Sequence, residues 1–221
     1  MIVERWSEVS RYFPDPTDPR LVAESGTNTA AAPSPPPIAT PRGSVLELFA
    51  RIQGTHRILE IGTGGGYSTV RLARGLPPGG RLIALEPNPQ DAEVARETIA
   101  RAGLTEVVQV REGPALSSLP ALAAEGRGPF DLIFIDGDRP AYPEYLSWAL
   151  KLSRRGSVIL ADNVIPSQSA ADAASADRNV RGVRRFHELL AAEQRVSATA
   201  IRTVGRARSG GYAVAFVTSD P

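Results

Sequence analysis

Three oxygen-bearing residues follow two short apolar segments and could together hold a divalent cation. Asp136 ends the run 130–136, and the pair Asp162-Asn163 ends the run 157–162. Both runs have the length and composition of buried strands. If the strands are parallel neighbours, both acids lie at one sheet edge, where two carboxylates repel each other unless a positive charge separates them. Carboxylate and amide oxygens are ligands that Mg²⁺ and Ca²⁺ prefer. The pattern predicts a cation site; two helix-capping acids are the alternative.

A glycine-rich turn follows another apolar run. The segment 58–61 precedes four glycines within five residues, Gly62 to Gly66, and Tyr67 then begins a helical pattern. Glycine lets backbone N–H groups approach a ligand closely, and the N-terminus of a helix attracts negative charge. The spacing is G-x-G-x-G rather than the G-x-G-x-x-G of dinucleotide folds, so a purely structural turn is the alternative.

An acid stands at the end of the next predicted strand. Glu86 ends the run 81–86, 24 residues after Gly62. In nucleotide-binding sheets an acid at this place hydrogen-bonds ribose hydroxyls. The position does not separate NAD from S-adenosylmethionine, and a solvated surface glutamate is the alternative.

Strand and helix patterns alternate along the chain around these residues. This alternation predicts an α/β fold with a doubly wound, mostly parallel, seven-stranded sheet. The last two strands are joined by residues 205–211, too few for a helical crossover, so they should form an antiparallel C-terminal hairpin. The predicted strands are 58–61, 81–86, 107–111, 130–136, 157–162, 197–203 and 212–218, and the predicted helices are 67–76, 89–103, 140–153 and 178–193.

The N-terminal 40 residues differ in composition from the rest. Residues 1–13 predict a short helix, and a proline-rich stretch up to Pro41 follows. We interpret 1–40 as a segment bordering the site, with a plain linker as the alternative, and 41–221 as the ligand-binding domain. Thr40-Pro41 has the pattern of an N-cap followed by proline at N1. The apolar face of that helix is expected at Val45, Leu46, Phe49 and Ile52.

The amino-acid composition excludes several kinds of chemistry for this protein. The 221 residues carry a net charge of +1 and contain no cysteine, which excludes disulfides, thiolate metal sites and a cysteine nucleophile. The charge gives no general attraction to nucleic acid or membrane. Because neither a signal peptide nor a long apolar run is visible, we expect a cytoplasmic protein with no membrane contact.

Four segments jointly resemble the catechol and caffeoyl-CoA type of metal-dependent O-methyltransferase: 59–68, 83–86, 130–139 and 161–164. The resemblance covers about residues 38–218. It implies a class I methyltransferase fold, which is Rossmann-like, with S-adenosylmethionine as the methyl donor. It further implies methyl transfer to a hydroxyl of a small catechol-like aromatic, in a homodimer.

The resemblance also assigns residues. Glu60, Gly62, Tyr67 and Ser68 should line the methionine end of the cofactor, with Glu86 at the ribose and Ala115 near the adenine. The full implied cofactor-binding set is Ile38, Glu60, Gly62, Thr63, Gly64, Gly66, Tyr67, Ser68, Glu86, Pro87, Gly113, Pro114, Ala115, Asp136, Asp138 and Tyr145. Asp136, Asp162 and Asn163 match the ligands of Mg²⁺, or of Mn²⁺ or Ca²⁺. Asp136 and Arg139 take the catalytic positions.

Arg139 departs from the family pattern, which has lysine there as the base on the acceptor hydroxyl. An arginine stays protonated near neutral pH and cannot accept that proton. Since a cation-coordinated hydroxyl is already more acidic, Arg139 could stabilise the phenolate instead. The other interpretation is a weakened activity, or a cofactor-binding module without catalysis.

The two histidines are the alternative candidates for a base, but a structural role is the favoured interpretation of each. His56 precedes the first strand and so belongs to the opposite edge of the sheet, and His187 shares a helix face with Val180, Val183 and Leu190, as a packed histidine does.

Two further activities remain open. Eight arginines stand between 178 and 208; they are a solvated basic face or a contact for a phosphate-bearing acceptor, a CoA ester or tRNA. An NAD-dependent oxidoreductase is the less favoured choice, because that class gives no reason for the set Asp136, Asp162 and Asn163.

Overall fold

A computed structural model describes residues 41–164, 176–203 and 210–220. The predicted helix over 1–13, the proline-rich segment, Ile38 and Thr40 lie outside these residues, as do Arg206 and Arg208.

Seven strands form one sheet in the order β3-β2-β1-β4-β5-β7-β6. The first five are parallel neighbours, and β7 runs antiparallel to both β5 and β6. The strands are β1 (Arg57–Ile61), β2 (Arg81–Glu86), β3 (Val108–Glu112), β4 (Leu132–Ile135), β5 (Val158–Ala161), β6 (Val196–Thr203) and β7 (Gly210–Val217). The predicted mostly parallel sheet with a C-terminal antiparallel hairpin is confirmed.

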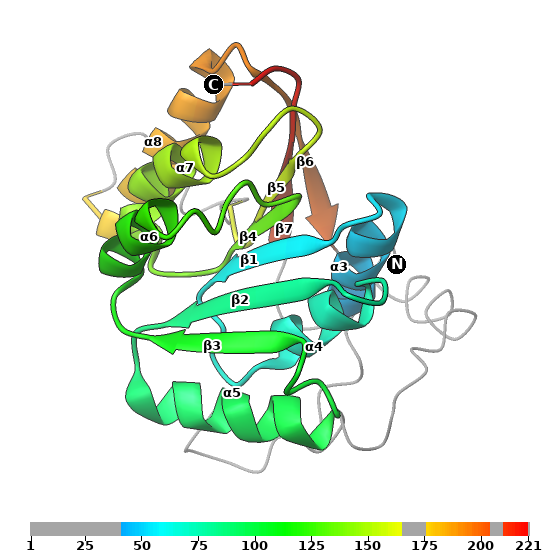
Figure 1. Ribbon diagram of the computed structural model, residues 1–221. Coiled ribbons are helices and arrows are strands. Elements are labelled where there is room, and N and C mark those ends of the chain that lie inside the picture. Colours follow the sequence, from blue (N-terminus) through cyan, green and yellow to red (C-terminus); the bar gives the residue numbers. More distant parts are fainter. Residues whose placement is uncertain (1–40, 165–175, 204–209, 221) are drawn as a thin grey trace, which may run out of the picture.

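Helices cover both faces of the sheet (Figure 1). One face packs against α6 (Ala115–Ala124), α7 (Tyr142–Lys151) and α8 (Arg178–Ala192). The other packs against α3 (Pro41–Ile52), α4 (Tyr67–Arg74) and α5 (Pro89–Arg101). Because both faces are covered, the central strands β1, β2, β4 and β5 are buried almost throughout. This burial explains why their sequences are nearly continuous apolar runs.

The observed ends of elements differ from the predicted ones where local geometry intervenes. Helix α4 ends at Arg74, two residues early, with Gly75 as its C-cap. The helix predicted from residue 140 begins at Tyr142, because Arg139–Ala141 form a separate 3₁₀ turn, η1, that carries Pro140. Ile52 was expected on the buried face of α3 but is 83% exposed, since it is the last residue of the helix.

Helix α6 was not predicted. Its ten residues include Pro120 inside the helix, and a proline there usually costs about 3 kcal/mol. Leu119 and Leu122 are fully buried in the core against the sheet. Tertiary packing of these side chains therefore outweighs the local signal. Among the described residues, no helix is long and apolar enough to cross a membrane.

Candidate active site

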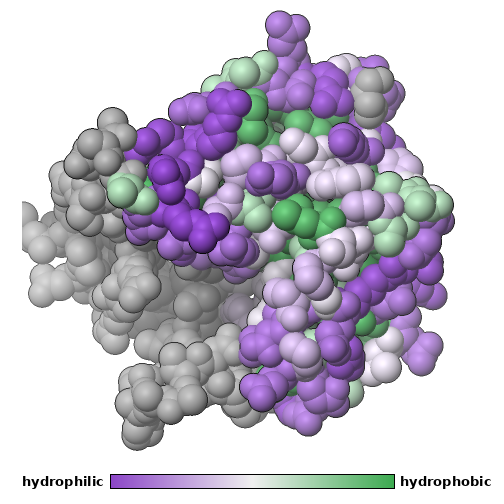
Figure 2. Space-filling view, turned by 90° about the vertical axis from the view of Figure 1, so that its left-hand side faces the viewer, coloured by the Kyte–Doolittle hydropathy of each residue, from purple (hydrophilic) through white to green (hydrophobic). Residues whose placement is uncertain are grey.

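The carboxyl ends of the parallel strands bring the predicted site residues to one edge of the sheet. Arrowheads of β1, β2 and β3 point to the same side in Figure 1. Figure 2 looks onto that side, where hydrophilic residues surround smaller hydrophobic groups. In an open α/β sheet this edge is where ligands bind.

Gly62 brings the turn after β1 against the end of β4. Its φ is +88°, a conformation that favours glycine. A Cβ atom at this position would lie 2.6 Å from the backbone oxygen of Asp136. The predicted glycine turn and the predicted acid are therefore in direct backbone contact. Gly64 and Gly66, in the same turn, also have positive φ values.

Glu60 is a fully buried acid in β1, directly below this turn. Its carboxylate accepts hydrogen bonds from Ser68 Oγ at 2.5 Å and Thr69 Oγ1 at 2.6 Å, both on α4. The hydroxyl of Thr69 also contacts that of Thr63. Burial, together with the smaller effect of the charges of Asp136 and Glu86, raises the pKa of Glu60 to about 7, although the two hydroxyl hydrogen bonds lower it. Glu60 can therefore carry a proton near neutral pH.

Glu86, at the end of β2, binds the glycine turn. Its Oε2 accepts hydrogen bonds from the backbone N–H groups of Thr63 (3.2 Å) and Gly64 (2.8 Å), and its Oε1 accepts one from Asn88 N–H. The bonds to Thr63 and Gly64 fix the glycine turn against the end of β2. A carboxylate has lone pairs beyond those three bonds, so Glu86 can also accept hydrogen bonds from ribose hydroxyls.

The two aspartates of the predicted cation site follow neighbouring strands. β4 and β5 pair in parallel, as expected, and Asp136 and Asp162 come directly after them. Asn163 connects the two: its Nδ2 lies 3.4 Å from Asp136 Oδ1 and 3.2 Å from Asp162 Oδ2. Its own backbone N–H donates to Asp162 Oδ1 at 2.7 Å. Asn163 has a φ of +57°, a conformation that asparagine tolerates better than most residues.

The donor set is two carboxylates and one amide. Over the described residues there is no group of three or more His, Cys, Asp or Glu side chains arranged to hold a metal ion.

Arg139 begins η1, next to this set. The turn packs against α8 at Gly182, where a Cβ atom would collide with the Arg139 carbonyl oxygen and lie 2.7 Å from Pro140 Cα. Tyr142, the first residue of α7, is fully buried and donates from its hydroxyl to the Asp162 carbonyl at 3.0 Å. Burial, and then the charges of Asp136 and Asp162, raise the pKa of Tyr142 well above its usual range, while Arg139 opposes them. Tyr142 therefore acts as a neutral donor.

The remaining predicted residues lie around the same edge. Gly113 donates its N–H to the Glu86 carbonyl at 2.9 Å, Pro114 is the N-cap of α6, and Ala115 is the first residue of this helix. Tyr145 is buried on α7 and packs near Gly137, and burial raises its pKa. Pro87 and Asp138 are exposed.

The hydroxyl of Tyr67 is buried beside Gly43 of α3 and has no hydrogen-bond partner among the described residues.

Tyr142 and Tyr145 fit the aromatic spacing that follows the Asp motif in the resembled family, but two other supporting residues were not identified from the sequence as parts of the site. Gly182 carries no local signal for its contact with η1, because this contact joins segments far apart in the chain. His187 was interpreted as a packed histidine, and its ring does pack at 5.6 Å from that of Phe186. It also bonds the Val164 carbonyl at 2.8 Å, one residue after Asn163. Since a carbonyl only accepts, Nε2 of His187 carries a proton.

Comparison with known proteins defines the class. A family model described as O-methyltransferase matches residues 15–206. The sequence is 47% identical to the catechol O-methyltransferase of Niastella koreensis over 195 residues, which are 87% of this chain and 88% of that protein. The structure matches an O-methyltransferase from Bacillus cereus in complex with S-adenosylhomocysteine (SAH), with a TM-score of 0.87, 46% identity, and coverage of 98% of this chain and 100% of that one. It also matches TomG of Streptomyces achromogenes in complex with S-adenosylmethionine, with a TM-score of 0.88, 42% identity, and coverage of 99% and 100%.

The sheet order, the glycine turn and these matches together define a class I methyltransferase. More particularly, the chain belongs to the O-methyltransferase family, and it is an S-adenosylmethionine-dependent O-methyltransferase of the catechol and caffeoyl-CoA type.

Proposed function

We propose that this enzyme requires a divalent cation, preferably Mg²⁺, and methylates one hydroxyl of a small aromatic that carries two neighbouring oxygens. The observation that supports this most directly is the convergence of Asp136, Asp162 and Asn163 at the ends of β4 and β5. The catechol O-methyltransferase of Niastella koreensis, by its name, acts on such a diol.

The three side chains fit a hard cation. Nδ2 of Asn163 now lies between the two carboxylates and compensates their repulsion as a hydrogen-bond donor. A half-turn of this amide would present its carbonyl oxygen to the same place, giving three oxygen donors with two negative charges. When bound there, a divalent cation lowers the pKa of a hydroxyl that coordinates it.

The chain's own residues would then position the acceptor and stabilise the charge that develops on it. Asp136, Asp162 and Asn163 would hold the cation and so orient the two oxygens of the acceptor. Arg139 cannot take the acceptor's proton, but its fixed charge can stabilise a developing phenolate. Tyr142 keeps the turn after β5 in place through the Asp162 carbonyl. Alignment of oxygen, carbon and sulfur supplies much of the rate in such a transfer.

A radiolabelled-cofactor assay tests this proposal. The acceptors would be catechol, phenol with its single hydroxyl, a caffeoyl-CoA ester and total tRNA, each with Mg²⁺ and with EDTA. We expect methylation of catechol with Mg²⁺, and little of phenol or of any acceptor in EDTA. Methylation that is equal for phenol and catechol, or that persists in EDTA, contradicts the proposal. The ester and tRNA test the basic segment, whose Arg178, Arg181 and Arg185 are exposed on α8.

A further inference from the structure

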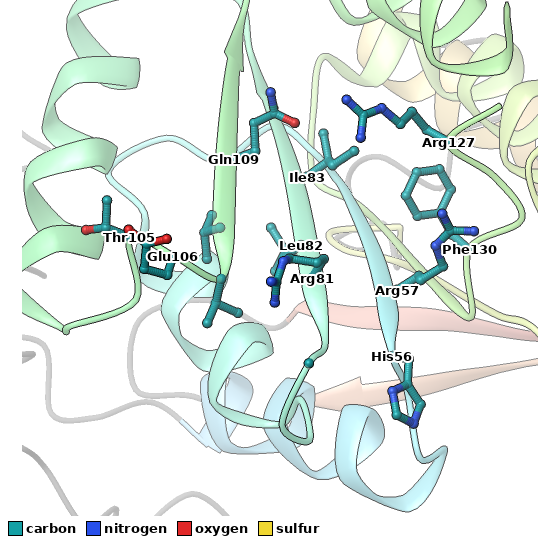
Figure 3. Close-up of a pocket in the computed structure, with 13 residues that line it drawn as sticks. His56, Arg57, Arg81, Leu82, Ile83, Thr105, Glu106, Gln109, Arg127 and Phe130 are labelled. Atoms are coloured by element: carbon teal, nitrogen blue, oxygen red, sulfur yellow. The ribbon is translucent and has the colours of Figure 1, made fainter. Parts of the chain in front are cut away.

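A cavity lies at the amino edge of the sheet, opposite the candidate active site. Its volume is about 550 Å³, and it is bordered by the starts of β1, β2 and β3 and by the connection from α6 to β4 (Figure 3). β1 has five residues, so at about 3.3 Å per residue the two edges are about 15 Å apart. A ligand in this cavity would not touch the cofactor.

The cavity combines an apolar wall with basic side chains. Ile83 and the ring of Phe130 line its interior, and Arg57, Arg81 and Arg127 reach it from three different segments. Glu106 is the one acidic side chain among the lining residues, against three arginines. Pockets of this volume, with apolar walls and a few convergent polar groups, are typical of small-molecule sites.

Arg57 and Arg81 begin adjacent parallel strands in direct register. Neighbouring like charges on paired strands repel each other. Each guanidinium donates only to a backbone carbonyl: Arg57 Nη1 to Gly128 at 3.4 Å, and Arg81 Nη1 to Gly80 at 2.9 Å. Within the part of the chain that the structure describes, neither forms an ion pair with a carboxylate.

Two carboxylates close to these segments already have arginine partners: Asp131, which accepts from the backbone N–H of Arg57, pairs with Arg154, and Glu125 pairs with two other arginines. Glu125 bonds Arg111 at 2.6 Å and Arg127 at 3.1 Å. Hydrogen bonds from Arg111 and then Arg127 lower the pKa of Glu125 to about 2, so it stays charged and is shared between these two arginines. It does not neutralise Arg57 or Arg81, whose positive charge is left for an anion from outside.

We propose that this cavity binds a small organic anion, with its phosphate or carboxylate group between Arg57 and Arg81 and its apolar, ring-sized body against Ile83 and Phe130. Arginine forms charge-assisted hydrogen bonds to both groups, in a geometry that allows two parallel contacts. The apolar wall distinguishes this ligand from a free inorganic ion.

Calorimetric titration with benzyl phosphate tests the proposal. The protein would be saturated with SAH and kept in EDTA, so that the opposite edge is filled and free of metal. Inorganic phosphate and benzyl alcohol serve as comparison ligands, each with half of the proposed chemistry. We expect benzyl phosphate to bind at least about tenfold more tightly than either, since both charge and apolar burial contribute.

Substitutions of single arginines test whether benzyl phosphate binds in this cavity. Arg57→Gln and Arg81→Gln should each weaken benzyl phosphate about tenfold, the usual scale for a lost charge-assisted bond. Arg155→Gln removes the same charge from an exposed arginine in the turn before β5, outside the cavity, and should change nothing. SAH affinity should be equal in all three, as evidence of intact folding. Amide NMR shifts at Ile83 and Gln109 should accompany binding.

Three results would overturn the proposal. Equal losses in Arg155→Gln and Arg81→Gln would mean a general charge effect. Inorganic phosphate binding as tightly as benzyl phosphate would mean that the apolar wall is not used. A change of sedimentation in Arg57→Gln or Arg81→Gln, without benzyl phosphate binding to the wild type, would mean that the cavity is a protein interface.

Discussion

Side chains at the carboxyl edge of the sheet have two functions. Some would bind a ligand, and others keep the turns at this edge in place. Asp162 has both functions in the proposed site, since its carboxylate belongs to the proposed donor set and its backbone carbonyl accepts a hydrogen bond from Tyr142. Substitution of the side chain alone therefore separates the two roles.

Asp162→Asn should abolish methyl transfer and the response to Mg²⁺, while SAH affinity changes less than about threefold. One of only two anionic donors is lost from a site that must compete with water for a reluctantly dehydrated ion. Initial rates over a Mg²⁺ titration, with SAH calorimetry, provide the measurement. Asp220→Asn is the control, because Asp220 lies at the other edge and accepts from the Arg155 N–H. Normal methylation by Asp162→Asn in EDTA would exclude the assigned cation site.

Arg139→Ala should lower kcat by about 10–100-fold, because a developing phenolate loses its positive partner. Arg139→Lys should keep or raise the rate and add a titratable group to the pH–rate profile, within the 10²–10⁴-fold scale of general-base effects. Arg155→Ala is the matched control. An unchanged rate in Arg139→Ala would remove this residue from the mechanism, and an inactive wild type that gains activity as lysine would support the weakened-activity interpretation.

Glu60 should make stability fall as pH rises. Its pKa is about 7 in the folded chain against an ordinary 4.5, so the folded state binds the proton more tightly. The resulting stabilisation is present below pH 4.5 and is lost as pH rises through 7, about 2 kcal/mol between pH 5.5 and 8. Urea unfolding in EDTA at these two pH values, with Glu60→Gln as the comparison, measures it. The idea fails if the pH dependence is the same in both proteins.

At the scale of elements, the close approach of segments far apart in the chain shapes the site. Gly62 lets the turn after β1 touch the end of β4, and Gly182 lets α8 touch η1. His187, also on α8, bonds the segment after β5. Helix α8 thus contacts both turns that carry the candidate ligands.

Gly62→Ala should cost clearly more stability than Gly79→Ala. Both glycines have similar φ values, +88° and +84°. A Cβ atom at Gly62 would meet the Asp136 backbone, whereas the space at Gly79 is open. We expect about 1–2 kcal/mol for the backbone strain alone at Gly79 and about 3 kcal/mol or more at Gly62, together with weaker SAH binding. If urea unfolding shows the same loss of unfolding free energy in both variants, the backbone after β4 can move away from the new Cβ atom without destabilising the protein.

The whole molecule should respond to its cofactor as one folding unit. SAH at about 100 times its dissociation constant should raise the free energy of unfolding by about 2.7 kcal/mol, because it binds only the folded chain. NAD should have no effect. Chemical unfolding with each ligand measures this, and Asp162→Asn should keep the SAH effect. Stabilisation by NAD and not by SAH would contradict the assigned donor.

Much of this protein was predictable because its signals are local. Apolar runs of strand length, glycines followed by a helical pattern, and acids at strand ends are features of neighbouring residues. The convergence of Asp136 with Asp162 follows from them, since carboxyl ends of parallel strands meet at one edge. The same reasoning assigned His56 to the opposite edge, where it lines the cavity at the amino ends of the strands. The role of residues 1–40, the homodimer and the individual cofactor contacts stay predictions.

Only the tertiary structure decided the strand order, the existence of α6 and the contacts of α8. Pro120 argues locally against a helix, and burial of Leu119 and Leu122 overrides it. Nothing near Gly182, Tyr142 or His187 in the sequence indicates that they contact the turns after β4 and β5. The paired Arg57 and Arg81 are 24 residues apart, and their proximity exists only once β1 and β2 are in register. Such contacts form only when distant segments pack together in the folded protein. They therefore produce no periodic pattern in the sequence.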